Sequence, residues 1–296
     1  MPWLQLHIPS TADAAEQVED ALMALGANAV TLSDAADQPL FEPPPGATPL
    51  WRETVVSALF PADADEQGLL AGLVATLGAP PADYRFEQLA DQVWERAWMD
   101  DFKPMQFGER LWIVPSWAEP LTGNAVNLRL DPGLAFGTGT HETTAMCLAW
   151  LDGADLTGKT VLDFGCGSGV LAIAALLLGA ERVLACDIDP QALLATRENA
   201  TLNGVSDRLE CCLPDAMPTQ ASFDLVIANI LAGPLVSLAP QLLGYCASGA
   251  ALVLSGILNA QANEVMAAYA PDIRFAPPAR QGDWTRLAGV RVDPRT

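Results

Sequence analysis

The chain has few basic residues, and lysine is almost absent. Its 296 residues include 15 Lys and Arg but 36 Asp and Glu, so the formal net charge at pH 7 is −21. The only lysines are Lys103 and Lys159, and the arginines are scattered along the sequence. Proteins that bind nucleic-acid phosphates or anionic lipid surfaces need clusters of positive charge. The composition therefore argues against direct nucleic-acid binding and against binding to a membrane surface.

Long apolar runs and metal-binding motifs are also missing. The longest uninterrupted apolar run, Val170 to Leu178, is about half the length that a membrane-spanning helix requires. The N-terminal segment lacks the basic start of a secretion signal, so we expect a cytoplasmic protein. With two histidines and six cysteines that form no C-x-x-C pair, the sequence has no zinc motif, and we predict no metal site.

Residues 1–90 are predicted to form a small α+β domain. Strand patterns occur at 3–8, 29–32, 54–60 and 84–89, and helical patterns at 10–25 and 65–77. The resulting order βαββαβ is typical of a ferredoxin-like fold. Residues 1–100 contain 16 acidic residues against three arginines, a net charge of −13. Such acidity is consistent either with solubility alone or with the docking of a basic partner.

The remainder of the chain has a different pattern. Apolar residues at helical spacing predict a linker helix over residues 91–104, with a break at Pro104. From 105 to 296, strand and helix patterns alternate, which favours a Rossmann-like α/β domain with a parallel, doubly wound sheet. The predicted strands lie at 111–114, 125–130, 161–164, 183–187, 209–213, 224–229 and 251–255.

The clearest functional motif is VLDFGCGSGV at residues 161–170, an apolar strand that turns through three glycines into a helix. Ligands of open α/β sheets bind beyond the carboxyl ends of the strands, so we expect a nucleoside-like ligand above Gly165 and Gly167. Dinucleotide-binding folds use G-x-G-x-x-G instead, and the carboxylate of Asp163 would repel a pyrophosphate. A carboxylate suits the ammonium and sulfonium groups of S-adenosylmethionine, by direct or water-bridged contact. We therefore predict S-adenosylmethionine as the cofactor.

Polar residues also end the neighbouring strands. Asp187 lies where a carboxylate can accept both ribose hydroxyls, whereas Asp189, just before Pro190, fits the N-cap of the next helix better. Asn229 ends the run 224–229, and its amide oxygen can accept an N–H from an amine. A local turn role for Asn229 is also consistent with the sequence.

The loop at residues 131–144 is rich in glycine and threonine. Phe136 offers a flat apolar face and Thr144 a hydroxyl group that could close over a cofactor, while Thr140 or Thr143 could cap the helix expected at 145–151. His141 is a candidate general base, although a single histidine in such a loop is more often structural.

Together, FGTGTHETT at 136–144, DFGCGSG at 163–169 and NILA at 229–232 resemble the bacterial methyltransferases that modify large-subunit ribosomal protein eleven. The resemblance extends to residues 94–104 and 107–112 and to the acidic N-terminal region, so it covers nearly the whole chain. It implies a class I methyltransferase domain at 105–296, preceded by a domain at 1–90 that recognises the ribosomal protein. By motif, the implied cofactor contacts are Thr144, Gly165, Asp187 and Asn229, and Gly167 joins them through the glycine turn.

The implied reaction is methylation of lysine side chains and of the N-terminal α-amine of that basic protein. Because lysine ordinarily titrates near 10.4, the amine must lose its proton before it attacks the methyl group. The sequence indicates no strong base, so we expect proximity and partial desolvation to favour the neutral amine, with Asn229 as the catalytic residue that orients it. The alternatives are a class I methyltransferase acting on a small molecule, an NAD-dependent dehydrogenase, and a non-catalytic assembly protein. We expect a monomer.

Overall fold

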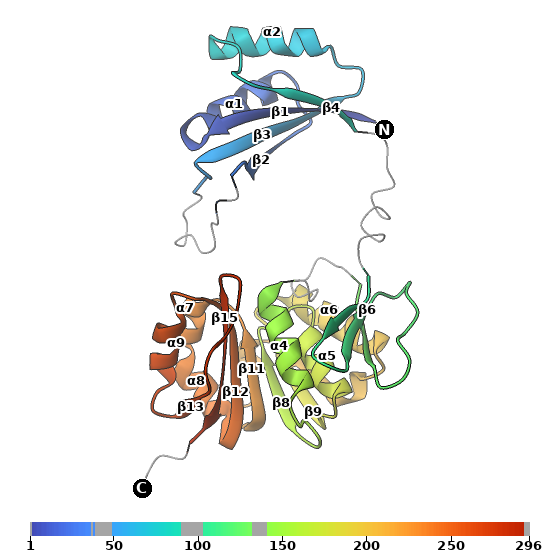
Figure 1. The fold of residues 1–296 in the computed structure, drawn as a ribbon, viewed down its shortest axis with the longest axis vertical. Coiled ribbons are helices and arrows are strands. Elements are labelled where there is room, and N and C mark those ends of the chain that lie inside the picture. The colour runs from blue at the N-terminus through green and yellow to red at the C-terminus, as the bar shows by residue number, and fades with distance from the viewer. Residues whose placement is uncertain (1, 37, 39–48, 90–102, 132–140, 293–296) are drawn as a thin grey trace. The chain divides into compact units, whose positions relative to one another are not determined.

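The computed structural model describes residues 2–36, 38, 49–89, 103–131 and 141–292. The chain divides into two compact units, Met1–Ala97 and Trp98–Thr296, which are described separately below (Figure 1). The predicted linker helix at 91–104 falls almost entirely outside the described residues, and it stays a prediction.

The first unit is a four-stranded antiparallel sheet with two helices. Its elements are β1 (Trp3–Thr11), α1 (Ala12–Ala24), β2 (Ala29–Asp34), β3 (Glu53–Pro61), α2 (Glu66–Leu77) and β4 (Arg85–Leu89). The strand order β2-β3-β1-β4, with each neighbouring pair antiparallel, confirms the predicted ferredoxin-like fold. Alternate residues of β1, namely Leu4, Leu6 and Ile8, point to the face that α1 and α2 cover, and they form the core of this unit.

The second unit contains the remaining α-helices and strands of the described residues. They are β5 (Met105–Phe107), β6 (Leu111–Val114), β7 (Val126–Arg129), α4 (Glu142–Asp152), β8 (Thr160–Phe164), α5 (Val170–Leu177), β9 (Arg182–Cys186), α6 (Pro190–Leu202), β10 (Leu209–Cys212), β11 (Phe223–Asn229), α7 (Ala232–Ser237), α8 (Ala239–Tyr245), β12 (Cys246–Leu258), α9 (Ala262–Tyr269), β13 (Ile273–Phe275), β14 (Ala279–Gln281) and β15 (Trp284–Arg291). Strands β5, β6 and β7 form a separate small sheet.

The main sheet of this unit has the order β10-β9-β8-β11-β12-β15-β13, with β14 paired to β15. The strands from β10 to β12 are parallel, as predicted, and the order reverses between β8 and β11 as in doubly wound folds. Strand β15 is antiparallel to both β12 and β13, so the sheet is mixed. No strand beyond residue 255 is predicted from the sequence, so this antiparallel addition was missed.

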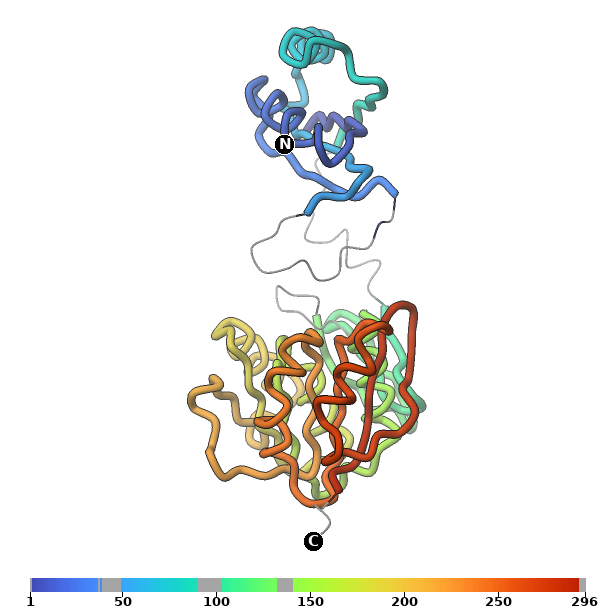
Figure 2. The backbone as a smooth tube through the Cα atoms, turned by 90° about the vertical axis from the view of Figure 1, so that its left-hand side faces the viewer, coloured from blue at the N-terminus to red at the C-terminus, as the bar shows by residue number. Residues whose placement is uncertain are grey.

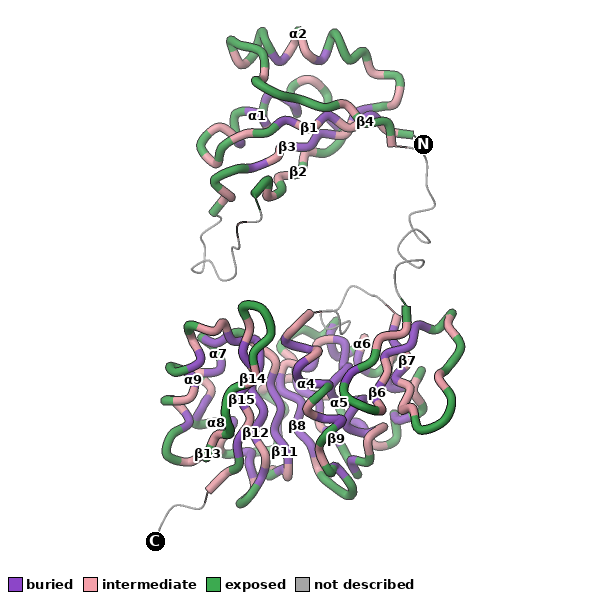
Figure 3. The backbone as a smooth tube through the Cα atoms, in the orientation of Figure 1, coloured by how far each residue is buried: buried purple, intermediate pink, exposed green. Residues whose placement is uncertain are grey.

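Helices cover both faces of the main sheet, and each face has its own core. Helices α4, α5 and α6 pack on one face, and α7, α8 and α9 on the other, where they come to the front in Figure 2. The central parallel strands β8 and β11 are buried along most of their length, which explains their continuous apolar runs (Figure 3). Among the described residues, no helix has the length and apolar character needed to cross a bilayer.

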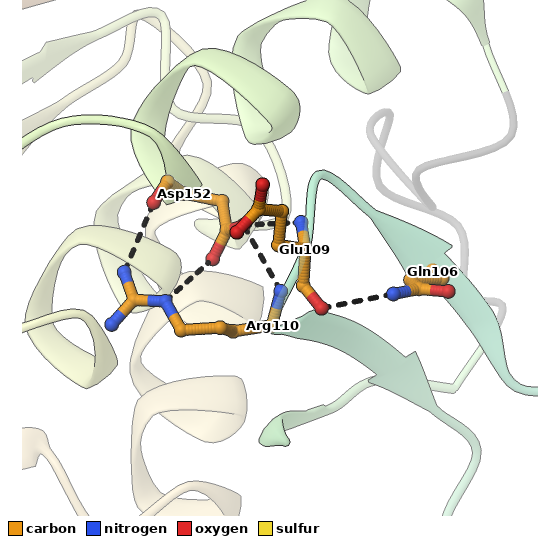
Figure 4. A network of polar contacts seen from close by, with 4 residues as sticks. All are labelled: Gln106, Glu109, Arg110 and Asp152. Carbon is orange, nitrogen blue, oxygen red and sulfur yellow. Dashed lines mark hydrogen bonds and ion pairs between the residues drawn. The ribbon is translucent and has the colours of Figure 1, made fainter. Parts of the chain in front are cut away.

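The β5–β6 hairpin is tied to the last residue of α4, Asp152. The buried Asp152 carboxylate accepts hydrogen bonds from the backbone N–H groups of Glu109 and Arg110, and it forms an ion pair with the Arg110 guanidinium, Nε to Oδ1 3.4 Å (Figure 4). Gly108 has a φ of 73°, and a β-carbon there would overlap the Asp152 side chain. The hairpin that begins the second unit is therefore fixed to the helix that precedes β8.

Candidate functional site

The predicted site residues lie at one edge of the main sheet. Strands β9, β8 and β11 are adjacent and parallel, so their carboxyl ends meet at the same edge. This edge carries the glycine turn after β8, Asp187 after β9 and Asn229 at the end of β11. The topology thus places together three features that are up to 64 residues apart in the sequence.

In the glycine turn between β8 and α5, four backbone N–H groups make hydrogen bonds within the protein. The N–H groups of Gly165 and Cys166 both donate to the Cys186 carbonyl oxygen, at 2.7 and 3.1 Å, and that of Gly169 donates to the Cys166 oxygen. The N–H of Gly167 donates to Asp187 Oδ2 at 2.9 Å. In dinucleotide-binding folds such N–H groups face a pyrophosphate. Here these four bond within the protein, which argues against the dehydrogenase alternative.

Asp187 connects the glycine turn to its own loop. While Oδ2 accepts the Gly167 N–H, Oδ1 accepts the N–H of Asp189 at 3.0 Å. Each carboxylate oxygen has two lone pairs, so both can accept a further hydrogen bond from a ligand hydroxyl. As predicted, the N-cap of α6 is Asp189, whose side chain accepts the Gln191 N–H at 2.8 Å, with Pro190 as the first helical residue.

Asp163 lies beneath the turn and is completely buried. Its Oδ2 accepts the N–H of Ala172, in the first turn of α5, at 3.0 Å, and thus supplies the side-chain cap that Gly169 cannot provide. Burial, with a contribution from the charge of Asp187, raises the pKa of Asp163 to about 7. The other oxygen, Oδ1, is buried and has no hydrogen-bond partner among the described residues. The direct or water-bridged contact with the cofactor that the sequence predicts for Asp163 stays a prediction.

Asn229 and Thr144 are in contact. Asn229 Nδ2 donates to Thr144 Oγ1 at 3.2 Å, which leaves the amide oxygen Oδ1 facing away from Thr144. This oxygen is buried and has no hydrogen-bond partner among the described residues. Ser255, opposite Asn229 on β12, donates to the Thr143 carbonyl oxygen at 3.1 Å and so fixes the start of α4 to the sheet. The arrangement presents an acceptor without a partner, which is costly unless a ligand supplies a donor.

The loop before α4 is only partly described. Phe136 and Thr140 lie outside the described residues. His141 is itself the N-cap of α4: its Nδ1 accepts the Thr143 N–H at 3.4 Å, and its ring meets that of Trp284 edge to face. The expectation that Thr143 caps this helix is wrong, because the helix begins at Glu142 and places Thr143 inside its first turn.

Two exposed apolar side chains at this edge were not predicted as site residues. Ile188, directly after Asp187, has 82% of its surface exposed, and Leu231, two residues after Asn229, has 49% exposed. The strand order places them on opposite sides of the glycine turn. The sequence signal that could have identified them is an apolar residue close after the polar residue that ends a strand. The exposure of such a residue cannot be predicted from local sequence.

Comparison with known proteins identifies the family. The model of the ribosomal protein L11 methyltransferase (PrmA) family matches residues 2–292. The chain belongs to this family. Family membership confirms the predicted class, an S-adenosylmethionine-dependent methyltransferase.

Relatives in the L11 methyltransferase family match the chain over nearly its full length. The ribosomal protein L11 methyltransferase of Pseudomonas aeruginosa is 58% identical over 292 residues, covering 98% of this chain and 99% of the relative. That of Azotobacter vinelandii is 56% identical, covering 98% of this chain and all of the relative. The crystal structure of a ribosomal protein L11 methylase from Lactobacillus delbrueckii subsp. bulgaricus has 36% identity and a TM-score of 0.58, covering 65% of this chain and 100% of that chain.

Proposed function

We propose that this chain transfers methyl groups from S-adenosylmethionine to amines of ribosomal protein L11, namely lysine side chains and the N-terminal α-amine. The observation that carries the proposal is the amide oxygen of Asn229 at the carboxyl edge of the sheet, which is buried and without a hydrogen-bond partner in the described part of the chain. An amine N–H is the donor that this oxygen lacks. The names of the full-length relatives support L11 as the substrate.

The residues at the edge fit the cofactor from one end to the other. Asp187 would accept the ribose hydroxyls with its remaining lone pairs, and the exposed Ile188 beside it would cover one face of the adenine. Gly165, with a φ of 79°, would let the cofactor approach the backbone, and a β-carbon there would overlap the side chain of Ile230. Gly167 would contact the cofactor through its backbone, and Thr144 would contact it through its hydroxyl group.

The bound cofactor supplies an electrophilic methyl group on a sulfonium. The protein must present a neutral amine in line with that methyl group, and Asn229 would orient the amine through Oδ1. Thr144 fixes the amide because it accepts a hydrogen bond from Nδ2, so the oxygen and not the nitrogen faces the amine. Desolvation next to a positive cofactor would lower the pKa of the incoming ammonium and release its proton to water. His141 has a structural role in this scheme, as the cap of α4.

The first unit would recognise the substrate by charge. Residues 1–100 have a net charge of −13, and ribosomal proteins are generally basic, so the acidic unit would steer such a partner. We expect the KM for the protein substrate to rise with ionic strength while cofactor affinity changes little. The modification would take place in the cytoplasm, with the enzyme as a monomer and without direct contact to nucleic acid.

The test is to incubate the purified chain with methyl-labelled S-adenosylmethionine and the separated proteins of unmethylated large ribosomal subunits. We expect label in one band, L11, and mass spectrometry should locate it on lysines and the α-amine. Bound cofactor without label in any protein band would overturn the proposed substrate. It would favour the small-molecule methyltransferase instead.

A further inference from the structure

The turn after β11 is held in place by two glycines from other elements. Asn229 ends the strand, Ile230 follows, and Leu231 is the N-cap of α7. A β-carbon on Gly256 of β12 would overlap the backbone of Ile230, since it would lie 2.8 Å from the Ile230 carbonyl carbon. A β-carbon on Gly165 would overlap the Ile230 side chain. The positions of Asn229 and Leu231 therefore depend on close packing around Ile230.

The turn exposes one apolar side chain in this fixed position. Leu231 is 49% exposed, while Ala232 and Leu235, on the helix that it begins, are buried. Two residues earlier, Asn229 has the acceptor oxygen for which the described residues supply no hydrogen-bond donor. An exposed leucine beside a hydrogen-bond acceptor matches the shape of a lysine, in which an apolar stem precedes the amine.

We propose that Leu231 is a specificity-determining residue that packs against the methylene stem of a lysine acceptor, in a position fixed by Gly256. The proposal rests on the proposed function, because it takes protein amines as the acceptors. An N-terminal α-amine has no methylene stem, so its methylation should depend much less on Leu231. The proposed side chain thus distinguishes two acceptors that share the same reacting group.

The test compares Leu231→Ser with Leu202→Ser, using the full chain and L11. Leu202 is 45% exposed at the last turn of α6, a helix that starts at the carboxyl edge and runs back along β9, so it lies away from the site. Loss of contact with one or two methylene groups should raise the KM for lysine methylation about four- to fifteenfold in Leu231→Ser, because each buried methylene contributes about fourfold. The KM for α-amine methylation should stay within about twofold, and Leu202→Ser should match the wild type for both.

The outcomes separate this inference from the proposed function. An unchanged KM for lysine in Leu231→Ser, or an equal rise for both acceptors, would overturn the stem contact. Failure of the wild type to methylate L11 would instead overturn the proposed function.

The role of Gly256 has its own matched control on the same strand. Gly249 also has positive φ, 73° against 82° for Gly256, but a β-carbon there would meet nothing within 4 Å. We expect Gly256→Ala to lower kcat/KM for lysine at least tenfold and Gly249→Ala to change it less than threefold, with cofactor binding by calorimetry confirming that both fold. Additional truncation by Ile230→Ala should leave Gly256→Ala impaired, because the overlap there is with backbone. Equal activities of the two glycine variants would show that packing against Ile230 does not fix the turn.

Discussion

Two turns at the carboxyl edge of the same sheet are fixed by different means. The turn after β8, residues 165–169, is held by hydrogen bonds: its N–H groups bond to Cys186, Asp187 and Cys166, and α6 binds its carbonyls through Thr196 and Asn199. The turn after β11, residues 229–232, is held by close packing of Ile230 against Gly165 and Gly256. In the proposed function, the first turn would face the cofactor and the second would face the amine.

The difference has a chemical reason. A cofactor of fixed shape can be bound by a fixed turn, and hydrogen bonds specify geometry within a few tenths of an ångström. The acceptors differ, since a lysine has a stem and an α-amine does not. An apolar contact beside a single amide acceptor tolerates that variation, because dispersion and hydrophobic contacts are non-directional.

The largest effect should come from the acid buried beneath the hydrogen-bonded turn. Its pKa of about 7 in the folded state lies above the ordinary value of 3.8 for an aspartate, so the native state binds more protons than the unfolded state between those values. Stability linked to Asp163 is therefore fully present below about pH 4 and is lost as the pH rises through 7. Asp163→Asn should remove this dependence and raise the free energy of unfolding at pH 8 by up to about 4 kcal/mol. Urea denaturation from pH 5 to 8 measures it.

The control for this experiment is Asp189→Asn, which changes an exposed carboxylate and keeps an N-cap. Its stability should follow the wild-type pH profile. Saturating S-adenosylmethionine should reduce the difference between Asp163→Asn and the wild type, because nearby positive charge favours the ionised acid. A pH profile shared by wild type and Asp163→Asn would contradict the buried-acid interpretation.

Asp187→Ala breaks the hydrogen-bonded turn at its junction with β9. The variant loses the acceptors for Gly167 and Asp189 as well as the proposed ribose contact. The two hydrogen bonds that the ribose hydroxyls would donate to the Asp187 carboxylate are worth about 3 kcal/mol or more. Cofactor affinity should therefore fall at least about a hundredfold. Isothermal calorimetry gives the change directly, with Asp189→Ala as the comparison that loses only a cap. Undiminished cofactor binding in Asp187→Ala would refute the ribose assignment.

Asn229→Ala addresses the second turn and should separate turnover from cofactor binding. Loss of the oxygen that orients the amine should lower kcat about a hundredfold, because misplacement of a reacting group costs about that much. The dissociation constant of the cofactor should change only a few-fold. Single-turnover methylation and calorimetry, run in parallel, measure the two quantities. An unchanged kcat in Asn229→Ala would contradict the catalytic role of Asn229.

The structure of the first turn could be predicted from the sequence, whereas the packing that holds the second turn could not. The pattern around Gly165, Gly167 and Gly169 is local, so the strand, the turn and the helix could all be predicted from one window. Asp187 and Asn229 followed because parallel strands end at a common edge. The same logic gave the ferredoxin-like order of the first unit, where strand alternation and helix spacing are regular.

Contacts between distant segments could not be predicted. Nothing in the local sequence of Gly256 indicates that it packs against Ile230, because the contact exists only once β11 and β12 pair. The antiparallel β15 was missed although Gly282 and Asp283 form a two-residue turn between β14 and β15, a local hairpin signal. Its pairing with β12 joins segments that are separated by α9, and local sequence could not predict it. The N-cap of α4 was missed because a histidine imidazole substitutes for the usual hydroxyl or carboxylate acceptor.

The smallest effect should come from the apolar side chain on the cofactor side, which mirrors Leu231 across the glycine turn. Ile188 is 82% exposed next to Asp187, so a bound adenine would remove part of it from water. Ile188→Ser should weaken cofactor binding about four- to fifteenfold, the loss of one or two buried methylene groups, and should leave the KM for L11 within about twofold at saturating cofactor. Calorimetry and steady-state kinetics together decide the matter. If Ile188→Ser instead raised the KM for lysine acceptors and spared cofactor affinity, the assignment of the two exposed side chains to opposite ligands would be reversed.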